Sequence, residues 1–515
     1  MAVVPEPVFD VHQIQGNILR GFDTASLALV GVRFGPVDAA RRWLAGVLPR
    51  VSSLAAVHAS RLARSAGADT TGEILLNIAF SARALENLGL DVARTDPLFR
   101  QPMGAVAGSL FDPLDAKGQP LDYVVGATWD TTPDTLLLLG ASSADAADGA
   151  ARELIAAAED AGCTVVYRET GGMLPKEIEH FGFRDGISQV GPRGRLSDAE
   201  DDFLTPRLIA PGDPYFDLFG KPGQPLVWPG QFVFGYPSQL LDPLSPGPSA
   251  DGGQQWMRNG SFLVLRRLRQ DVAAFRAQMK ATGDALGAQL GRTVTEDEGA
   301  AMIVGRWKDG TPVLLSPDGP DADLAGDEMR VNNFAYAQGT PDLVVAGSDG
   351  TRCLAATADD AMGQRCPHFS HVRKVNPRDL VTDQGAPGNT LRLQMLRRGI
   401  PFGPLFSEDT KEVERGLLFM AYVTSLRNQF AVLNDIWVNN PDAPELVNEG
   451  HDLLIAQNAG RPRHAAYFDE AGVPRAHVTL SARAVVSTGG GFFFSPGFDC
   501  LRRLAAEEAP AGSQE

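Results

Sequence analysis

Strand-like segments that are each followed by a helix-like segment recur along this chain, and this alternation constrains the fold most. In the first half, residues 26–34 precede residues 37–48, residues 74–80 precede 82–90, and residues 135–139 precede 144–161. In the second half, residues 261–268 precede 271–290, and residues 416–423 precede 425–437. The repetition predicts a duplicated α+β unit, whose two sheets pack as a sandwich or barrel with helices outside.

A proline-rich stretch separates the two halves. Residues 191–230 contain seven prolines, a composition typical of loops: Pro192, Pro206, Pro211, Pro214, Pro222, Pro225 and Pro229. We therefore predict an N-terminal half of residues 1–225 and a C-terminal half of residues 226–506. Residues 507–515 have the composition of a disordered tail.

The charge of the chain excludes several classes of partner. The formal net charge is −17, which repels nucleic-acid phosphates and anionic membranes. No apolar run approaches the ~20 residues that span a bilayer. The four cysteines form no C-x-x-C pair, and the first 21 residues lack the basic start and apolar core of a secretory signal. The sequence predicts a cytoplasmic protein, with a compartment reached through a carrier protein as the alternative.

The first segment with candidate chemistry is His-Phe-Gly-Phe-Arg-Asp-Gly-Ile-Ser-Gln, residues 180–189. Its Asp185-Gly186 pair is common in turns, and a turn is the better explanation of the segment taken alone. Alternatively, a carboxylate beside Phe181 and Phe183 is partly desolvated, which raises its pKa toward a useful acid–base range.

The second segment, residues 366–374, contains His368 and His371. A single axial histidine suits haem iron. Two histidines three positions apart also suit zinc, but no Glu or Cys completes a set with the usual spacing, and a structural histidine is the third explanation. Three basic residues nearby suit either haem propionates or a solvated basic face: Arg373, Lys374 and Arg378.

Two further segments carry weaker signals. Residues 395–403 embed Arg397 in an apolar loop, where an arginine costs free energy unless it binds an anion or a ligand; a surface pair with Arg398 is the alternative. Residues 416–419 are typical of a buried strand that packs in the core or lines a pocket. The phosphate-binding, zinc-protease and serine-hydrolase motifs are absent from the sequence.

Taken in order, these motifs resemble the dye-decolourising peroxidase (DyP-type haem peroxidase) family, in its longer subgroup. The match covers nearly the whole chain, through residues 14–22, 182–186, 259–264, 305–307, 366–378, 397–403, 416–419 and 489–496. The Gly-x-x-Asp-Gly motif alone is weak. Followed by His-x-Arg-Lys-x-Asn-Pro-Arg and then Arg-Arg-Gly-Ile-Pro, it is specific.

The resemblance implies an α+β fold of two ferredoxin-like halves that form a dimeric α+β barrel or sandwich. Haem b (iron protoporphyrin IX) would lie between antiparallel sheet and helices, with His371 as the axial ligand, Asp185 as the distal acid–base group and Arg397 as the distal arginine. The other implied contacts are an apolar wall of Leu417 and Phe419, Arg373 near a propionate, and Asp452 on the axial histidine. Leu453 stands where the family usually has proline after that aspartate.

The implied activity is a peroxidase that reduces hydrogen peroxide and oxidises small aromatic electron donors, such as dyes and phenols, through an oxoferryl intermediate. Asp185 would relay a proton, Arg397 would stabilise the charge on the departing oxygen, and Asp452 would make His371 more electron-rich. An aspartate, with an ordinary pKa of about 3.9, predicts an acidic pH optimum. Whether the protein forms a homo-oligomer stays open.

Two alternatives and one electron route stay open at this point. A haem-binding or haem-transfer protein without turnover needs His371 but neither Asp185 nor Arg397, and a structural or cargo protein needs no haem. Trp437 is either an aromatic relay for electrons or a packing residue. Phe402 stands where some relatives have tyrosine, and phenylalanine is a far poorer radical relay.

Overall fold

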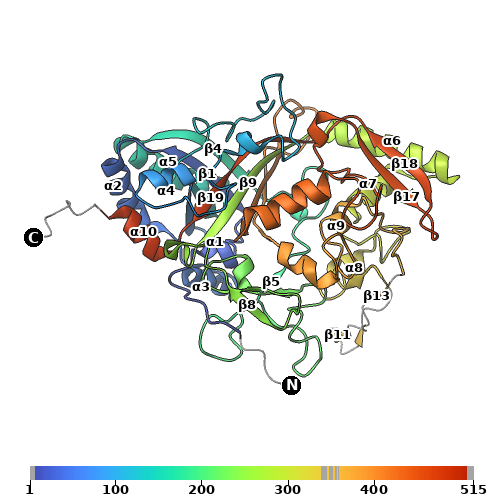
Figure 1. The fold of residues 1–515 in the computed structure, drawn as a ribbon, viewed down its shortest axis with the longest axis horizontal. Helices are drawn as coiled ribbons and strands as arrows, with labels where there is room; N and C mark the ends of the chain where they lie inside the picture. Colours follow the sequence, from blue (N-terminus) through green and yellow to red (C-terminus); the bar gives the residue numbers. More distant parts are fainter. Residues whose placement is uncertain (1–5, 338–344, 347–351, 354–355, 358, 507–515) are drawn as a thin grey trace, which may run out of the picture.

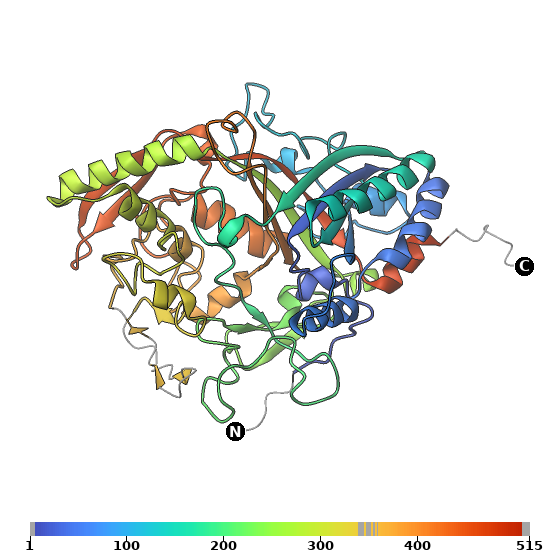
Figure 2. The same cartoon turned by 180° about the vertical axis from the view of Figure 1, so that it is seen from behind.

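A ring of antiparallel strands with helices outside forms the centre of the protein (Figures 1 and 2). This computed structural model describes residues 6–337, 345–346, 352–353, 356–357 and 359–506, so the predicted tail at 507–515 lies outside the described residues. The strand order is β16-β15-β4-β1-β3-β2-β19-β9, and β9 pairs again with β16, which closes the ring. The short strand β14 (Leu396–Arg397) also pairs with β16.

The first half supplies four neighbouring strands in the order β4-β1-β3-β2. They are β1 (Ser26–Arg33), β2 (Ile74–Phe80), β3 (Thr135–Ala141) and β4 (Thr164–Gly172). The helices of this half are α1 (Gly16–Leu19), α2 (Val37–Val47), α3 (Leu54–Ser65), α4 (Ala82–Asn87) and α5 (Ala144–Asp160). Helix α5 packs on β1, β3 and β4.

The second half supplies four strands in the equivalent order, β19-β9-β16-β15. They are β9 (Ser261–Gln270), β15 (Ile400–Phe402), β16 (Gly416–Val423) and β19 (Val485–Ser495). In each half the fourth strand lies beside the first, then come the third and the second, which is the ferredoxin-like arrangement. The predicted α+β duplication is confirmed.

The two sheets meet at two narrow seams. Phe402 of β15 pairs with Gly171 of β4, and Phe494 of β19 pairs with Phe80 of β2, one residue pair at each seam. The ring is therefore two four-stranded sheets joined edge to edge. The division at residues 225 and 226 stays a prediction.

Side-chain caps start several of the predicted helices. The side chains of Ser81, Asp271 and Ser425 accept hydrogen bonds from backbone N–H groups at the first turns of α4, α6 (Val272–Leu290) and η7 (Leu426–Val438). The bounds of β2 and β16 coincide with the predicted strands. The predicted helix over residues 425–437 is present as η7, which is a π-helix.

The second half has further elements outside the ring, of which α7 and α9 contribute residues to the candidate site. They are α7 (Glu296–Val304), α8 (Ala322–Gly326), α9 (His371–Lys374), α10 (Phe498–Ala505), and the hairpin of β17 (Arg463–Phe468) and β18 (Pro474–Leu480). Figure 1 shows α7, α8 and α9 grouped on one side of the ring.

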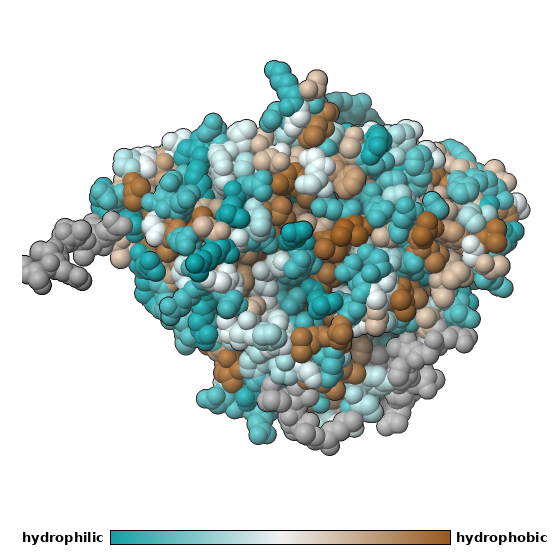
Figure 3. Space-filling model, viewed as in Figure 1, coloured by the Kyte–Doolittle hydropathy of each residue, from teal (hydrophilic) through white to brown (hydrophobic). Residues whose placement is uncertain are grey.

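Hydrophilic and hydrophobic residues are interspersed on the face drawn in Figure 3. Among the described residues, no helix has both the length and the apolar character needed to cross a membrane.

Candidate active site

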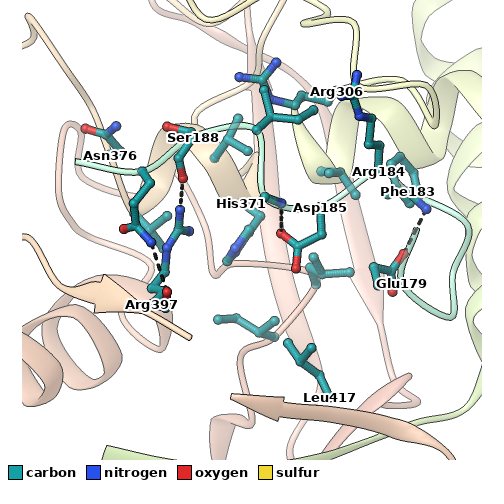
Figure 4. A pocket seen from close by; sticks show the side chains of 18 of the residues that line it. Glu179, Phe183, Arg184, Asp185, Ser188, Arg306, His371, Asn376, Arg397 and Leu417 are labelled. Carbon is teal, nitrogen blue, oxygen red and sulfur yellow. Dashed lines mark hydrogen bonds between the residues drawn. The ribbon is translucent and has the colours of Figure 1, made fainter. Parts of the chain in front are cut away.

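A cavity of about 270 Å³ lies between the loop that carries Asp185, helix α9 and the sheet of the second half. Its sheet wall comes from Leu268, Leu417 and Val485, on β9, β16 and β19. Asp185, His371, Arg397 and Leu417 all line it (Figure 4). The structure therefore brings four of the seven predicted site residues together from segments far apart in the sequence.

His371 is held by a buried carboxylate. It is the first residue of α9, and its Nδ1 lies 2.7 Å from Oδ2 of Asp452. The side chain of Asp452 is fully buried, whereas that of His371 is 25% exposed. Asp452 thus fixes Nδ1 of the imidazole, and the other ring nitrogen, Nε2, is available on the cavity side.

Asp452 is itself fixed by the backbone. Its Oδ1 accepts hydrogen bonds from the N–H groups of Leu454 (2.9 Å) and Ile455 (3.0 Å). Burial alone would raise the pKa of Asp452, but the neighbouring His371 and these hydrogen bonds outweigh burial and hold that pKa below its ordinary value. The carboxylate is therefore kept ionised against the ring.

Asp185 and Arg397 come from different segments that are tied together. Oδ1 of Asp185 accepts the backbone N–H of Gly186 at 2.7 Å, which leaves Oδ2 without a hydrogen bond to any residue that the structure describes. The Arg397 guanidinium donates to the carbonyl of Ser188, and the side-chain amide of Gln189 donates to the carbonyl of Arg397 at 3.0 Å. These bonds connect β14 to the loop that carries Asp185.

The expectation that Phe181 and Phe183 desolvate Asp185 is wrong. Both rings are buried and pack against Phe275 of α6, with the Phe181 and Phe275 centroids 4.0 Å apart, whereas Asp185 is exposed. The cavity is also lined by Glu179, and it is the pKa of this carboxylate that burial raises.

Phe419 and Arg373, by contrast, do not line the cavity. Phe419 lies two positions beyond Leu417 on β16 and packs half-buried against the main hydrophobic core. Arg373 is fully buried between acidic partners, with its guanidinium 2.8 Å from Glu445 and 3.3 Å from Asp360. Its charge is already neutralised, so its placement differs from the expected contact with a propionate.

Two other arginines present unneutralised charge to the cavity. Arg306 donates to the carbonyls of Gly310 and Val331 and to Oδ1 of Asn332, and Arg378 donates to groups of Asn332 and Phe334. Neither forms an ion pair with a carboxylate among the described residues. Burial, followed by the charge of Arg378, lowers the pKa of Arg306 to about 10. The wall formed by Arg306 and Arg378 therefore favours the binding of an anion.

Known proteins share both the sequence and the fold. An ancestral D-type dye decolorizing peroxidase superposes with a TM-score of 0.77 and 28% identity, over 97% of this chain and all of that one. A sequence profile described as Dyp-type peroxidase, C-terminal, matches residues 248–450. The multifunctional dye peroxidase DyP2 of an Amycolatopsis species is 29% identical over 518 residues, 96% of each chain.

A dye-decolorizing peroxidase of Exidia glandulosa is 31% identical over 445 residues, which cover 84% of this chain and 76% of that protein. This chain belongs to the dye-decolorizing peroxidase family. It is a peroxidase, and the haem-transfer and cargo alternatives are not favoured. Within the described part of this peroxidase, no group of three or more His, Cys, Asp or Glu side chains is placed to hold a metal ion.

Trp437 of this dye-decolorizing peroxidase is a packing residue. It is 1% exposed, it lies in a small core with Leu393 and Leu433, and its indole N–H donates to Asp383 at 2.9 Å. The placement matches the packing explanation and leaves Trp437 away from the surface.

Glu179 is the cavity residue that the sequence did not single out. Its two oxygens accept the backbone N–H groups of Phe181 (2.9 Å) and Phe183 (3.0 Å), and Gln270 donates to it at 2.5 Å. Burial raises its pKa to about 7, despite these hydrogen bonds. A glutamate three residues before Gly182 has no local pattern that distinguishes it from a surface acid.

We expect Glu179→Gln to change how stability depends on pH. A carboxyl group with a raised folded-state pKa contributes stability that is present below its ordinary pKa of 4.5 and is lost as the pH rises through about 7. The melting temperature of wild type should therefore fall relative to that of E179Q across this window. Glu177→Gln, at a side chain that is 59% exposed, is the matched control. A difference between wild type and E179Q that does not vary with pH would contradict the prediction.

Proposed function

We propose that this peroxidase binds haem b in the cavity, and that it uses hydrogen peroxide to oxidise small aromatic molecules such as phenols and dyes. His371 would hold the haem iron through its imidazole, and Asp185 and Arg397 would act on the bound peroxide. One observation carries the proposal: a single cavity brings together an imidazole backed by a buried carboxylate, a free carboxylate oxygen and a guanidinium.

The residues present fit haem. Its two propionates are anions, and Arg306 and Arg378 are cavity-lining cations with no carboxylate partner in the described chain. Its porphyrin is flat and apolar, and Leu417, Leu433 and Val485 supply apolar wall. The free nitrogen of His371 suits ferric iron.

When bound, haem would supply a redox-active iron that accepts oxidising equivalents from peroxide. Asp452 holds the His371 ring in one orientation and makes it a more electron-rich ligand. Oδ2 of Asp185, which is free, accepts the proton from one oxygen of peroxide and returns it to the other oxygen, the one that departs. Arg397, held by Ser188, stabilises the negative charge on that departing oxygen.

A relative supports phenols as donors. A dye-decolorizing peroxidase that is 26% identical to this chain has been solved in complex with 2,6-dimethoxyphenol. Two phenols would each lose one electron and one proton, and one peroxide would become two waters. The homo-oligomer and the cytoplasmic location stay predictions.

Steady turnover is the test of the proposed function. Haem-loaded protein with peroxide and 2,6-dimethoxyphenol should give continuous formation of coloured product at acidic pH, and none without peroxide. A protein that binds haem and responds spectrally to peroxide but oxidises no phenol or dye would be a haem-binding protein only, and the proposal would fail.

We expect Arg306→Gln and Arg378→Gln to weaken haem binding. A hydrogen bond to a charged partner contributes about 1.5–3 kcal/mol, so each variant should bind haem roughly 10- to 100-fold more weakly. The measurement is the rate and extent of haem transfer to excess apomyoglobin.

Arg373→Gln is the contrasting variant. It removes the guanidinium that neutralises the buried carboxylate of Glu445 and leaves only His368 beside that carboxylate, which costs about 3–5 kcal/mol. We expect it to lower the melting temperature of the haem-free protein. If R373Q instead retained that melting temperature and lost haem selectively, the assignment of the propionate wall would be wrong.

A further inference from the structure

A second cavity, of about 420 Å³, lies on the other side of the loop that carries Asp185. Residues 184–187 line both cavities, so this short segment is their shared wall. The other walls come from residues 17–24, residues 173–178 and residues 398–401. The proposed peroxidase chemistry uses only the first cavity.

The second cavity is apolar on several sides and basic on one. Its apolar lining suits a flat ring and comprises Phe22, Leu27, Met173, Leu174, Ile178, Ile187, Ile400 and Pro401. Its ionisable lining consists of four arginines (Arg20, Arg61, Arg184 and Arg398) and three acids (Asp23, Glu177 and Asp185), a net charge of +1 from 4 − 3. A basic cavity is unusual in a chain whose formal net charge is −17.

The acids do not neutralise the basic side evenly. Glu177 lies 3.5 Å from Arg184, and Asp23 lies 3.1 Å from Arg61. Neither Arg20 nor Arg398 forms an ion pair with a carboxylate in the described part of the chain. The excess positive charge is therefore located where the chain leaves α1.

Arg20 and Arg398 differ in how their donors are used. The Arg398 guanidinium donates to the carbonyls of Asn17, Ile18 and Leu19 at 2.9–3.0 Å, which fixes it on the end of α1. Arg20 donates to the carbonyl of Leu204 at 2.6 Å, and its Nε is buried with no hydrogen-bond partner. Burial and the charge of Arg61 lower the pKa of Arg20, and the opposing charge of Asp23 does not offset them. An orphaned donor on this side thus adds to the unbalanced charge.

We propose that the second cavity binds a small aromatic anion, a ring that carries a carboxylate or sulfonate, with the anionic group beside Arg20 and Arg61 and the ring on the apolar walls. A phenol of this kind would be held against the loop that carries Asp185. Its use as an electron donor rests on the proposed function; its binding does not. In turnover, two such phenols would each give one electron and one proton, and one peroxide in the first cavity would become two waters.

Binding is tested without peroxide. Haem-loaded protein is titrated by calorimetry with 4-hydroxybenzenesulfonate and, separately, with neutral 4-hydroxybenzenesulfonamide. We expect the sulfonate to bind at least about tenfold more tightly than the sulfonamide, because one hydrogen bond to a charged partner changes affinity by about this factor. Equal affinities would overturn the proposal. Inorganic sulfate that displaces the sulfonate with equal affinity would overturn the part assigned to the ring.

Variants locate the site. Arg20→Gln and Arg61→Gln should each weaken sulfonate binding about tenfold and have less effect on the sulfonamide. Arg50→Gln is the matched control, because Arg50 is a partly exposed arginine, paired with Glu153, whose loss changes the net charge equally. Sulfonate affinity that stays within about twofold of wild type in both R20Q and R61Q would overturn the proposal.

Turnover separates this inference from the proposed function. With peroxide present, the ratio of kcat/KM for the sulfonate to kcat/KM for the sulfonamide should fall about tenfold in R20Q and R61Q but not in R50Q. If neither phenol is oxidised while the sulfonate still binds through Arg20, the proposed function fails and the binding site stands.

Discussion

Replacing His371 with alanine is expected to remove the bond between the protein and haem iron and, with it, most of the bound haem. Loss of a residue that only supports a metal ligand typically costs 10–100-fold in affinity, so loss of the ligand itself should cost more than about 100-fold. The measurement is the ratio of Soret to protein absorbance after reconstitution with haem.

His368→Ala is the matched control for this prediction. His368 lies three residues before His371, but its Nδ1 is 2.7 Å from Glu445 in the buried charge cluster, and it does not line the cavity. H368A should therefore keep a wild-type Soret band wherever it folds. A protein that loses haem in H368A and keeps it in H371A would show that the ligand has been misassigned.

Asp185→Asn and Arg397→Leu are expected to give the largest losses of rate while haem stays bound. Positioned general acid–base groups contribute about 10²–10⁴-fold. A donor that stabilises developing negative charge contributes about 10²–10³-fold. The spectral change after peroxide is mixed with each variant should slow by these factors in a stopped-flow measurement.

Arg392→Leu is the control for the distal prediction. Arg392 is an exposed arginine five residues before Arg397 and does not line the cavity. It should react with peroxide at the wild-type rate. Rates that are unchanged in both D185N and R397L would mean that these side chains take no part in peroxide cleavage.

The fold could be predicted where local patterns decide it. The apolar runs of β2 and β16 are bounded by polar or turn residues, and Ser81 and Asp271 cap the helices that follow β2 and β9. Whether the two sheets close into a barrel or pack as a sandwich could not be decided from the sequence, because each seam is a single residue pair between distant strands.

The candidate site was predictable only in part. Motif order pointed to His371, Asp185 and Arg397, and the structure places all three on one cavity. The choice of arginine for the anion wall failed, because Arg373 is neutralised by Glu445, 72 positions away in the sequence. Sequence proximity to His371 cannot show which guanidinium meets a distant carboxylate.

Burial was the other property that local sequence did not reveal. Asp185 follows Phe181 and Phe183 closely in the chain, but those rings turn toward α6 and leave its carboxylate exposed. Glu179 stands between Ile178 and His180 in the chain and is enclosed by the fold, which raises its pKa to about 7. Tertiary packing decides where a side chain points and whether it is buried.

The position of iron in the haem-loaded protein tests the central claim most directly. Crystals of the reconstituted protein, measured at the iron absorption edge, should show one strong anomalous peak in the cavity, in bonding contact with the His371 nitrogen that does not face Asp452. Asp185 and Arg397 should lie on the opposite side of that peak. A peak at His368 or at the surface, or Asp185 and Arg397 on the same side of the iron as His371, would contradict the account.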